Sequence, residues 1–410
     1  MAVSMRKTFR VLPALALFLL GACSTTEQQV DELIATMSAN PLDSPAWQQA
    51  VDGLVVLGRP AARQLVAHID PEYYKGENYS EFREEIEKMR TGCALALGRI
   101  QHKAASATLV ARAVVAYTKA ERLACIWSVG ELGADQASID ALKVQLKDAD
   151  PQIRLYSGVA LIKMSDTTGV DQVRTALAGG DEELARQAIA QMEGTNFYGL
   201  PLLVELSQSS RAHQSQIGEV VEKVKVQVVK QLEADDPTLR LHSARTLSKV
   251  GDEGVYRALA KLLGDPSNLV RFNAAASLAE MNQAEGIGFL FAALQDQDPI
   301  LRVNAVKFLT EVQRSSGVVQ NQLVAALGNQ EALARSGAAQ VLGQAQVRAA
   351  VPALIGAVRD GNAEVRWNAL IALGRIRPPE ARAQIESLLH DENQTVAYYA
   401  EWALKQLGQG

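Results

Sequence analysis

Cysteine and histidine are the side chains with which this sequence could most readily do chemistry, and it contains three Cys and five His. A cysteine nucleophile needs a base beside it, and a metal site needs ligands at regular spacings. The five histidines are not spaced as metal ligands, and they do not recur at one position of the repeat described below. The sequence also lacks a glycine-rich phosphate loop, a GxSxG turn and an HExxH helix. We therefore expect a protein that is not an enzyme, with no catalytic residue, metal or cofactor.

Cys23 suggests a different chemistry, because it directly follows an apolar run. The first ten residues carry three positive charges and no acidic residue, and residues 11–22 (VLPALALFLLGA) are apolar. This pattern is typical of a secretory signal peptide and is too short to span a membrane. The Leu-Gly-Ala-Cys segment that ends at Cys23 resembles the bacterial lipoprotein box, in which the cysteine is acylated and becomes the mature N-terminus.

The lipoprotein resemblance implies a location in the bacterial cell envelope. Residues 1–22 would be a lipoprotein signal peptide, and acyl chains on Cys23 would hold the protein stably on a membrane. Ser24 stands where lipoproteins retained in the inner membrane usually carry Asp, which favours the outer membrane, facing the periplasm. The alternative is an ordinary signal peptide that happens to precede a cysteine. Residues 23–44 are predicted to be the lipidated N-terminus and a tether with one or two helical turns at most.

The composition limits the remaining possibilities. The chain has 410 residues, of which 48% are hydrophobic and 21% charged, so we expect an ordered protein. A net charge of -5 argues against binding to nucleic acid, which needs a basic surface. Three cysteines are too few for a fold held together by disulfides.

From residue 45 onward the sequence repeats. Ten anchor positions follow one another at steps of 31 to 33 residues, apart from one step of 55 residues. The third residue after each anchor is Ala, Ser or Cys, and the seventh is Leu, Val or Met. The anchors are Arg90, Arg122, Arg154, Ala185, Arg240, Arg271, Arg302, Arg335, Arg366 and Ala397.

Each repeat is predicted to form two helices. Asp-Pro pairs such as Asp265-Pro266 are typical of helix starts, and no segment shows the alternation of a β-strand. The Asp-Pro turn, the following Val-Arg and the small residues resemble the short bacterial type of HEAT repeat. This resemblance covers residues 45–410 and implies an all-α fold, an α-solenoid of about a dozen HEAT-like two-helix repeats. The signature is missing at 195–235, where we expect an irregular unit or hinge.

The repeat positions also predict how the helices pack. Small residues allow neighbouring helices to approach closely, and the large residue four positions later fills the layer behind them. The anchor arginine is expected to pair with an Asp of the neighbouring turn, as a structural contact. Cys93 and Cys125 share one repeat position on adjacent helices, which is too far apart for a disulfide, so two buried free thiols are predicted.

A further set of apolar residues falls one or five positions after the anchors, on the side of the helix away from the predicted core. In HEAT arrays the second helices line the concave face, so this stripe is predicted to bind a partner. The alternative is that it packs sideways between second helices. The predicted partner-binding residues are Leu123, Trp127, Leu155, Phe272, Trp367, Ile371, Tyr398 and Trp402.

These features favour a membrane-anchored periplasmic scaffold or adaptor. It would bind a protein or an extended peptide along a preformed concave surface, would reach the membrane through its N-terminal lipid and would bind no nucleic acid. One alternative is a carrier of an apolar ligand such as a lipid. A less favoured alternative is an enzyme resembling the bilin lyases. These HEAT-like proteins work in the cytoplasm, which the signal peptide contradicts. The sequence does not identify the partner.

Overall fold

A computed structural model of the chain describes residues 25–70, 82–133, 135–210 and 212–408. Within these residues every regular element is a helix, as the sequence predicts, and none is a strand. The chain divides into two compact units, residues 1–224 and 225–410. The dividing point lies inside 195–235, the stretch without the repeat signature; a hinge there remains a prediction.

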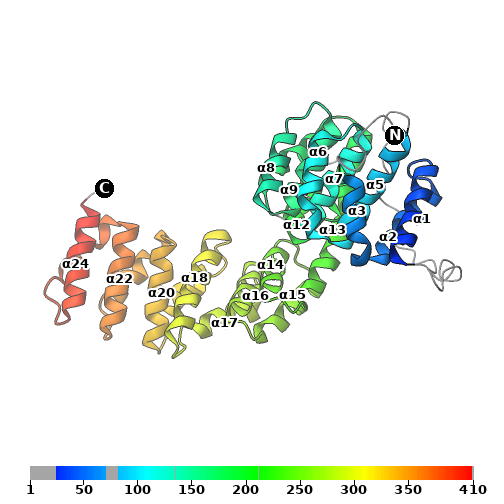
Figure 1. Ribbon diagram of the computed structural model, residues 1–410. Helices are drawn as coiled ribbons and strands as arrows, with labels where there is room; N and C mark the ends of the chain where they lie inside the picture. The colour runs from blue at the N-terminus through cyan, green and yellow to red at the C-terminus, as the bar shows by residue number, and fades with distance from the viewer. Residues whose placement is uncertain (1–24, 71–81, 134, 211, 409–410) are drawn as a thin grey trace. The chain divides into compact units, whose positions relative to one another are not determined.

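The helices of the N-terminal unit pair into successive layers (Figure 1). They are α1 (Thr26–Ala39), α2 (Pro45–Leu57), α3 (Arg59–Ile69), α5 (Arg83–Ile100), α6 (Ser106–Val115), α7 (Lys119–Leu132), α8 (Gln136–Gln145), α9 (Pro151–Lys163), α10 (Val170–Ala178), α11 (Glu182–Met192) and α12 (Asn196–Ser209). Short 3-10 turns precede two of them, Lys103–Ala105 and Thr167–Gly169. The dividing point falls within α13 (Gln214–Gln231).

The C-terminal unit continues the same alternation of first and second helices. Figure 1 shows its second helices α18, α20, α22 and α24 in one row. The helices are α14 (Pro237–Leu247), α15 (Glu253–Lys261), α16 (Asn268–Glu280), α17 (Ala284–Ala293), α18 (Pro299–Ser315), α19 (Gln320–Ala326), α20 (Ala332–Gln344), α21 (Val351–Ala357), α22 (Ala363–Ile376), α23 (Arg382–Glu386) and α24 (Gln394–Leu407). The 3-10 turns of this unit are Leu262–Gly264, Arg348–Ala350 and Pro379–Ala381.

The repeated small residues lie in the core, as predicted. All ten are buried: Cys93, Cys125, Ser157, Ala188, Ser243, Ala274, Ala305, Ala338, Ala369 and Ala400. The large residue four positions later is buried too, apart from Leu404 of α24, which is half-buried. Small side chains at these points allow consecutive second helices to pack closely.

Cys93 and Cys125 are both buried free thiols, which confirms that prediction. Burial raises the pKa of both thiols well above the ordinary value, because a thiolate there would lose its water. Neither cysteine is therefore an activated nucleophile.

Four of the eight anchor arginines pair with an aspartate of the next repeat, as predicted: Arg122, Arg240, Arg335 and Arg366. The Arg366 guanidinium donates from Nε and Nη2 to the Asp391 carboxylate, at 2.9 and 2.8 Å, and from Nη1 to the Asp360 carbonyl, at 3.0 Å. Arg335 and Arg240 make the same bidentate bonds to Asp360 and Asp265. These hydrogen bonds lower the pKa of the three carboxyls below the usual Asp value. Each pair therefore fastens one repeat to the turn of the next.

The tether expected in residues 23–44 is largely a helix in the structure. Helix α1 begins with a capping box in which Thr25 and Gln28 bond each other's backbone, and it packs on α2, α3 and α5. Its buried face is Val30, Ile34 and Met37. A Cβ added to Gly92 of α5 would clash with Met37, so α1 lies directly against that helix. The polar residues between these apolar ones had concealed the helical period.

Loss of the Arg366 clamp is expected to destabilise the C-terminal unit strongly. Arg366→Ala would leave the half-buried Asp391 carboxylate without its guanidinium partner and a loop carbonyl without that donor, at a cost of about 2 kcal/mol. Urea unfolding of the purified protein measures this loss. The matched control is Arg382→Ala, whose exposed ion pair with Glu386 should contribute at most about 0.5 kcal/mol. Equal losses for the two variants would show that the clamp is no stronger than a surface ion pair.

Candidate partner-binding site

The structure divides the eight predicted partner-binding residues into buried and accessible ones. Leu123, Leu155 and Phe272 are only 4%, 1% and 1% exposed, so their prediction as binding residues is wrong. Phe272 stacks on Phe308 of the neighbouring second helix, with ring centroids 5.6 Å apart. Phe272 therefore packs against a neighbouring second helix, which is the alternative that the sequence leaves open.

Trp402 also packs between helices. A Cβ added to Gly374 of α22 would clash with the Trp402 ring of α24, so the indole lies against α22 at a position that has no side chain. The Trp402 ring also meets Tyr399 edge-on, with centroids 6.3 Å apart. Trp402 is thus a structural wedge, although part of its surface remains accessible.

Two further predicted residues, Trp127 and Tyr398, are partly or largely exposed. The Lys163 ammonium lies 5.5 Å from the centre of the Trp127 ring and bonds Glu131, so charged side chains lie around this indole. Tyr398 is 63% exposed and touches Tyr399 edge-on. Both are accessible, and neither lines the pocket between α20, α22 and α24.

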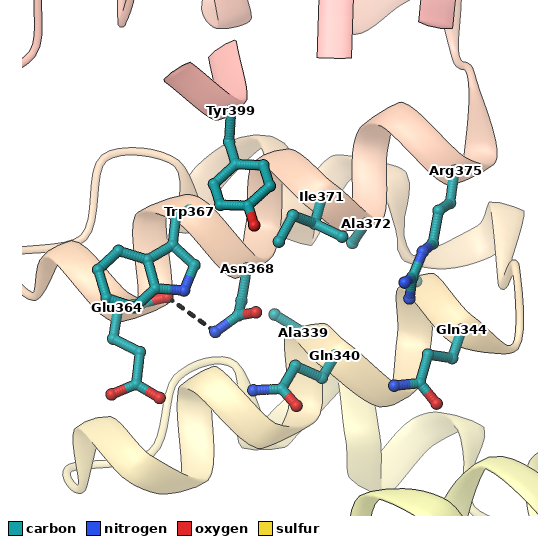
Figure 2. Close-up of a pocket in the computed structure, with 11 residues that line it drawn as sticks. Ala339, Gln340, Gln344, Glu364, Trp367, Asn368, Ile371, Ala372, Arg375 and Tyr399 are labelled. Carbon is teal, nitrogen blue, oxygen red and sulfur yellow. Dashed lines mark hydrogen bonds between the residues drawn. The ribbon is translucent and has the colours of Figure 1, made fainter. Parts of the chain in front are cut away.

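Trp367 and Ile371 line a pocket between the second helices α20, α22 and α24 of the C-terminal unit (Figure 2). Its volume is about 280 Å³. Figure 2 shows the Tyr399 side chain, from α24, pointing into the space beside Ile371. The remaining lining residues are Ala339, Gln340, Gly343, Gln344, Glu364, Asn368, Ala372 and Arg375. The pocket thus gathers two of the predicted residues with a set of polar ones that the sequence pattern had not singled out.

The spacing of the lining residues follows from helix geometry. On α22 they fall three or four positions apart from Glu364 to Arg375, which places them on one face. Asn362 starts this helix by accepting the Glu364 amide with its side chain. The floor of the pocket is narrow because α20 and α22 approach closely where Gly343 has no side chain. A Cβ at Gly343 would lie 2.5 Å from the Ala372 Cα.

A hydrogen-bonded polar group fixes one side of the pocket. The Asn368 amide donates to the Ser336 hydroxyl at 3.0 Å and to the Glu364 carbonyl at 3.1 Å. Ser336 in turn donates to the Glu364 carboxylate at 3.0 Å. Asn368 and Ser336 are buried, so these bonds hold the amide in one orientation, with its oxygen available as an acceptor.

The arrangement is suited to binding rather than to catalysis. An aromatic and aliphatic surface is bordered by amide, carboxylate, guanidinium and phenol groups, which can pair with polar groups of a ligand. No group of three His, Cys, Asp or Glu residues in the described part of the chain could hold a metal ion. The polar residues could have been found by extending the repeat comparison, since Gln340 holds the position equivalent to Ile371 and Trp402.

Residues 256–320 and 319–405 match the family model of HEAT repeats. No curated protein matches the chain. Similar solved structures include human deoxyhypusine hydroxylase in complex with glycerol, with 19% identity over 77% of this chain and 99% of that one and a TM-score of 0.26. A designed armadillo repeat protein shares 22% identity over 44% and 98% of the two chains, with a TM-score of 0.24.

Kap121p bound to Nup53p shares 12% identity over 94% of this chain and 45% of that chain, with a TM-score of 0.39. The three similarities carry no argument about function at these identities and TM-scores.

The Trp402 wedge predicts a dependence between two substitutions. Gly374→Ala should destabilise the protein because the new methyl group meets the Trp402 ring. In a Trp402→Ala background, itself destabilised by about 3 kcal/mol, the same change should stabilise by about 1 kcal/mol, the ordinary preference of a helix for Ala over Gly. Urea unfolding of the four proteins measures this coupling. A Gly374→Ala effect that is the same in both backgrounds would exclude the wedge.

Proposed function

On the premise that residues 256–405 are HEAT repeats, we propose that this protein is a scaffold or adaptor of the bacterial cell envelope. It binds a protein partner through an extended segment that enters the pocket between α20 and α22. Lipid on Cys23 anchors it, in the outer membrane and facing the periplasm.

The mixed lining of the pocket is the observation that supports a peptide ligand. No described residue donates to the Asn368 amide oxygen, Gln340 and Gln344 contribute further amides, and Trp367 offers a broad apolar surface. A peptide can satisfy both kinds of group, because its backbone donates and accepts hydrogen bonds while its side chains cover the indole. Amides and an aromatic surface side by side are thus suited to a polypeptide.

The lipid carrier is the less favoured alternative. An acyl chain would fill about 280 Å³ without pairing any of the amides or charges in the lining, and unpaired polar groups oppose binding. A lipid site is expected to be larger and predominantly apolar. No feature of the pocket favours the bilin-lyase alternative.

The anchoring proposal rests on the sequence around Cys23, which lies outside the described residues. In the part of the chain that the structure describes, no helix is long and apolar enough to cross a bilayer. Helix α1 begins at Thr26, only three residues after Cys23. A lipidated Cys23 would therefore hold the N-terminal unit within about 10 Å of the membrane surface, since an extended residue spans about 3.3 Å.

Site-specific photocrosslinking tests whether the pocket binds a partner. A photoreactive amino acid at Gln340, which lines the pocket, should give a protein adduct in intact cells, and Trp367→Ala should abolish that adduct. The same amino acid at Ala383, exposed on the first helix α23, is the control and should give none. The proposed site is wrong if position 340 gives no adduct, or if the adduct persists unchanged with Trp367→Ala.

Replacement of Cys23 tests the anchor. Cys23→Ser removes the thiol that would carry the acyl chains, so the protein should lose its lipid and either leave the membrane fraction or accumulate with its signal peptide. Metabolic labelling with a fatty acid and fractionation of cell envelopes measure both. Full membrane retention of a processed Cys23→Ser protein would contradict lipid anchoring at this residue.

A further inference from the structure

The pocket is a short groove that runs along α22. Eleven residues separate Glu364 from Arg375, which is about 16 Å along a helix and only about 20° around it. The two charged residues therefore lie on one face, three turns apart, with Trp367 and Ile371 between them. Figure 2 shows Glu364 and Trp367 at one end of the groove and Arg375 beside Gln344 at the other.

The positive charge at the end of this groove is not neutralised by its neighbours. Arg375 stands nine positions after its anchor, where other repeats pair: Glu131 bonds Lys163, and Lys249 lies 3.5 Å from Glu280. On α20 the equivalent residue is Gln344. The Arg375 guanidinium is exposed and has no hydrogen-bond or ion-pair partner among the described residues. It can therefore accept an anionic group without breaking an existing contact.

Glu364 supplies the opposite charge at the other end. One carboxylate oxygen accepts the Ser336 hydroxyl at 3.0 Å, and no cation of the described chain pairs with it. The hydrogen bond fixes the carboxylate beside Trp367, at the edge of the pocket. An isolated carboxylate in this position favours a cationic group on a ligand.

We propose that this groove binds an extended peptide segment whose sequence pattern is basic, any, apolar, any, acidic. The basic side chain pairs with Glu364, the apolar one covers Trp367 and Ile371, and the acidic one pairs with Arg375. Alternate residues of an extended chain point to one side and three of them span about 13 Å, so the long charged side chains cover the remaining few ångströms. This proposal rests on the proposed function and specifies its ligand.

The amide groups complete the match to a peptide backbone. The free Asn368 oxygen can accept a backbone N–H, and the Gln340 amide on the facing helix can donate to a carbonyl. A lipid phosphate or a free anion would use Arg375 alone and would not respond to changes at Glu364. The charge at the two ends therefore distinguishes a peptide from an anionic lipid.

The test uses defined peptides and the full chain in detergent. Fluorescein-labelled Ala-Lys-Ser-Phe-Ser-Glu-Ala, blocked at both ends, is titrated and followed by fluorescence anisotropy. Its two variants carry Lys at both charged positions or Glu at both. The wild-type protein should bind the mixed peptide about five- to tenfold more tightly than either variant, because each variant turns one ion pair into a repulsion.

Charge reversal in the protein should reverse the preference. Arg375→Glu should bind the doubly basic peptide best, and Glu364→Lys the doubly acidic one. Arg359→Glu and Glu401→Lys change the net charge equally at exposed positions outside the pocket, and they should retain the wild-type order. Glu364→Gln and Arg375→Gln should reduce the discrimination to about twofold or less while the protein remains folded by circular dichroism.

The outcomes separate this inference from the proposed function. An unchanged order of peptides in both charge-reversed proteins, or no binding of any peptide, would overturn the inference. Binding that depends on Arg375 alone would assign the groove to an anion rather than a peptide. The adduct from position 340 would still decide independently whether a protein partner binds there.

Discussion

The close approach of consecutive second helices is the constraint on which the rest of the structure depends. At each contact a small buried residue, and at several also a glycine, removes the side chain that would keep the helices apart. Gly343 faces Ala372, and Gly374 faces the Trp402 ring. This spacing lets the anchor arginine reach the aspartate of the next repeat, and it makes the pocket beside Trp367 narrow enough to be lined from two helices.

Much of the fold could be predicted because it depends on residues that recur at fixed positions. The small and large core positions recur in each repeat, and the Arg–Asp pairs join fixed positions of consecutive repeats. Helix α1 could not be predicted in this way, since it lies outside the repeat and its apolar face, Val30, Ile34 and Met37, is interrupted by polar residues. Its burial depends on α5, a partner far along the chain.

The candidate site was only partly predictable for a similar reason. A helical projection treats each second helix as buried on one side, whereas two neighbouring second helices also flank it. Leu155 and Phe272 are buried, although the helical projection places both on the side away from the core. Trp367 escapes full burial in a repeat where Gln340 and Gln344 on the preceding helix leave a polar edge. The exposure of Trp367 thus depends on the residues of two adjacent repeats together. A comparison of equivalent apolar positions alone does not predict it.

The central claim is that a partner segment lies on Trp367, in the pocket, and not along the whole aromatic stripe. The chain has four tryptophans, so an assigned ¹⁵N–¹H spectrum contains four indole signals. On addition of the peptide Ala-Lys-Ser-Phe-Ser-Glu-Ala, we predict that the Trp367 signal shifts and that the signals of the buried Trp47 and of Trp127 remain in place. A shift at Trp127 without one at Trp367, or no shift at all, would contradict the account.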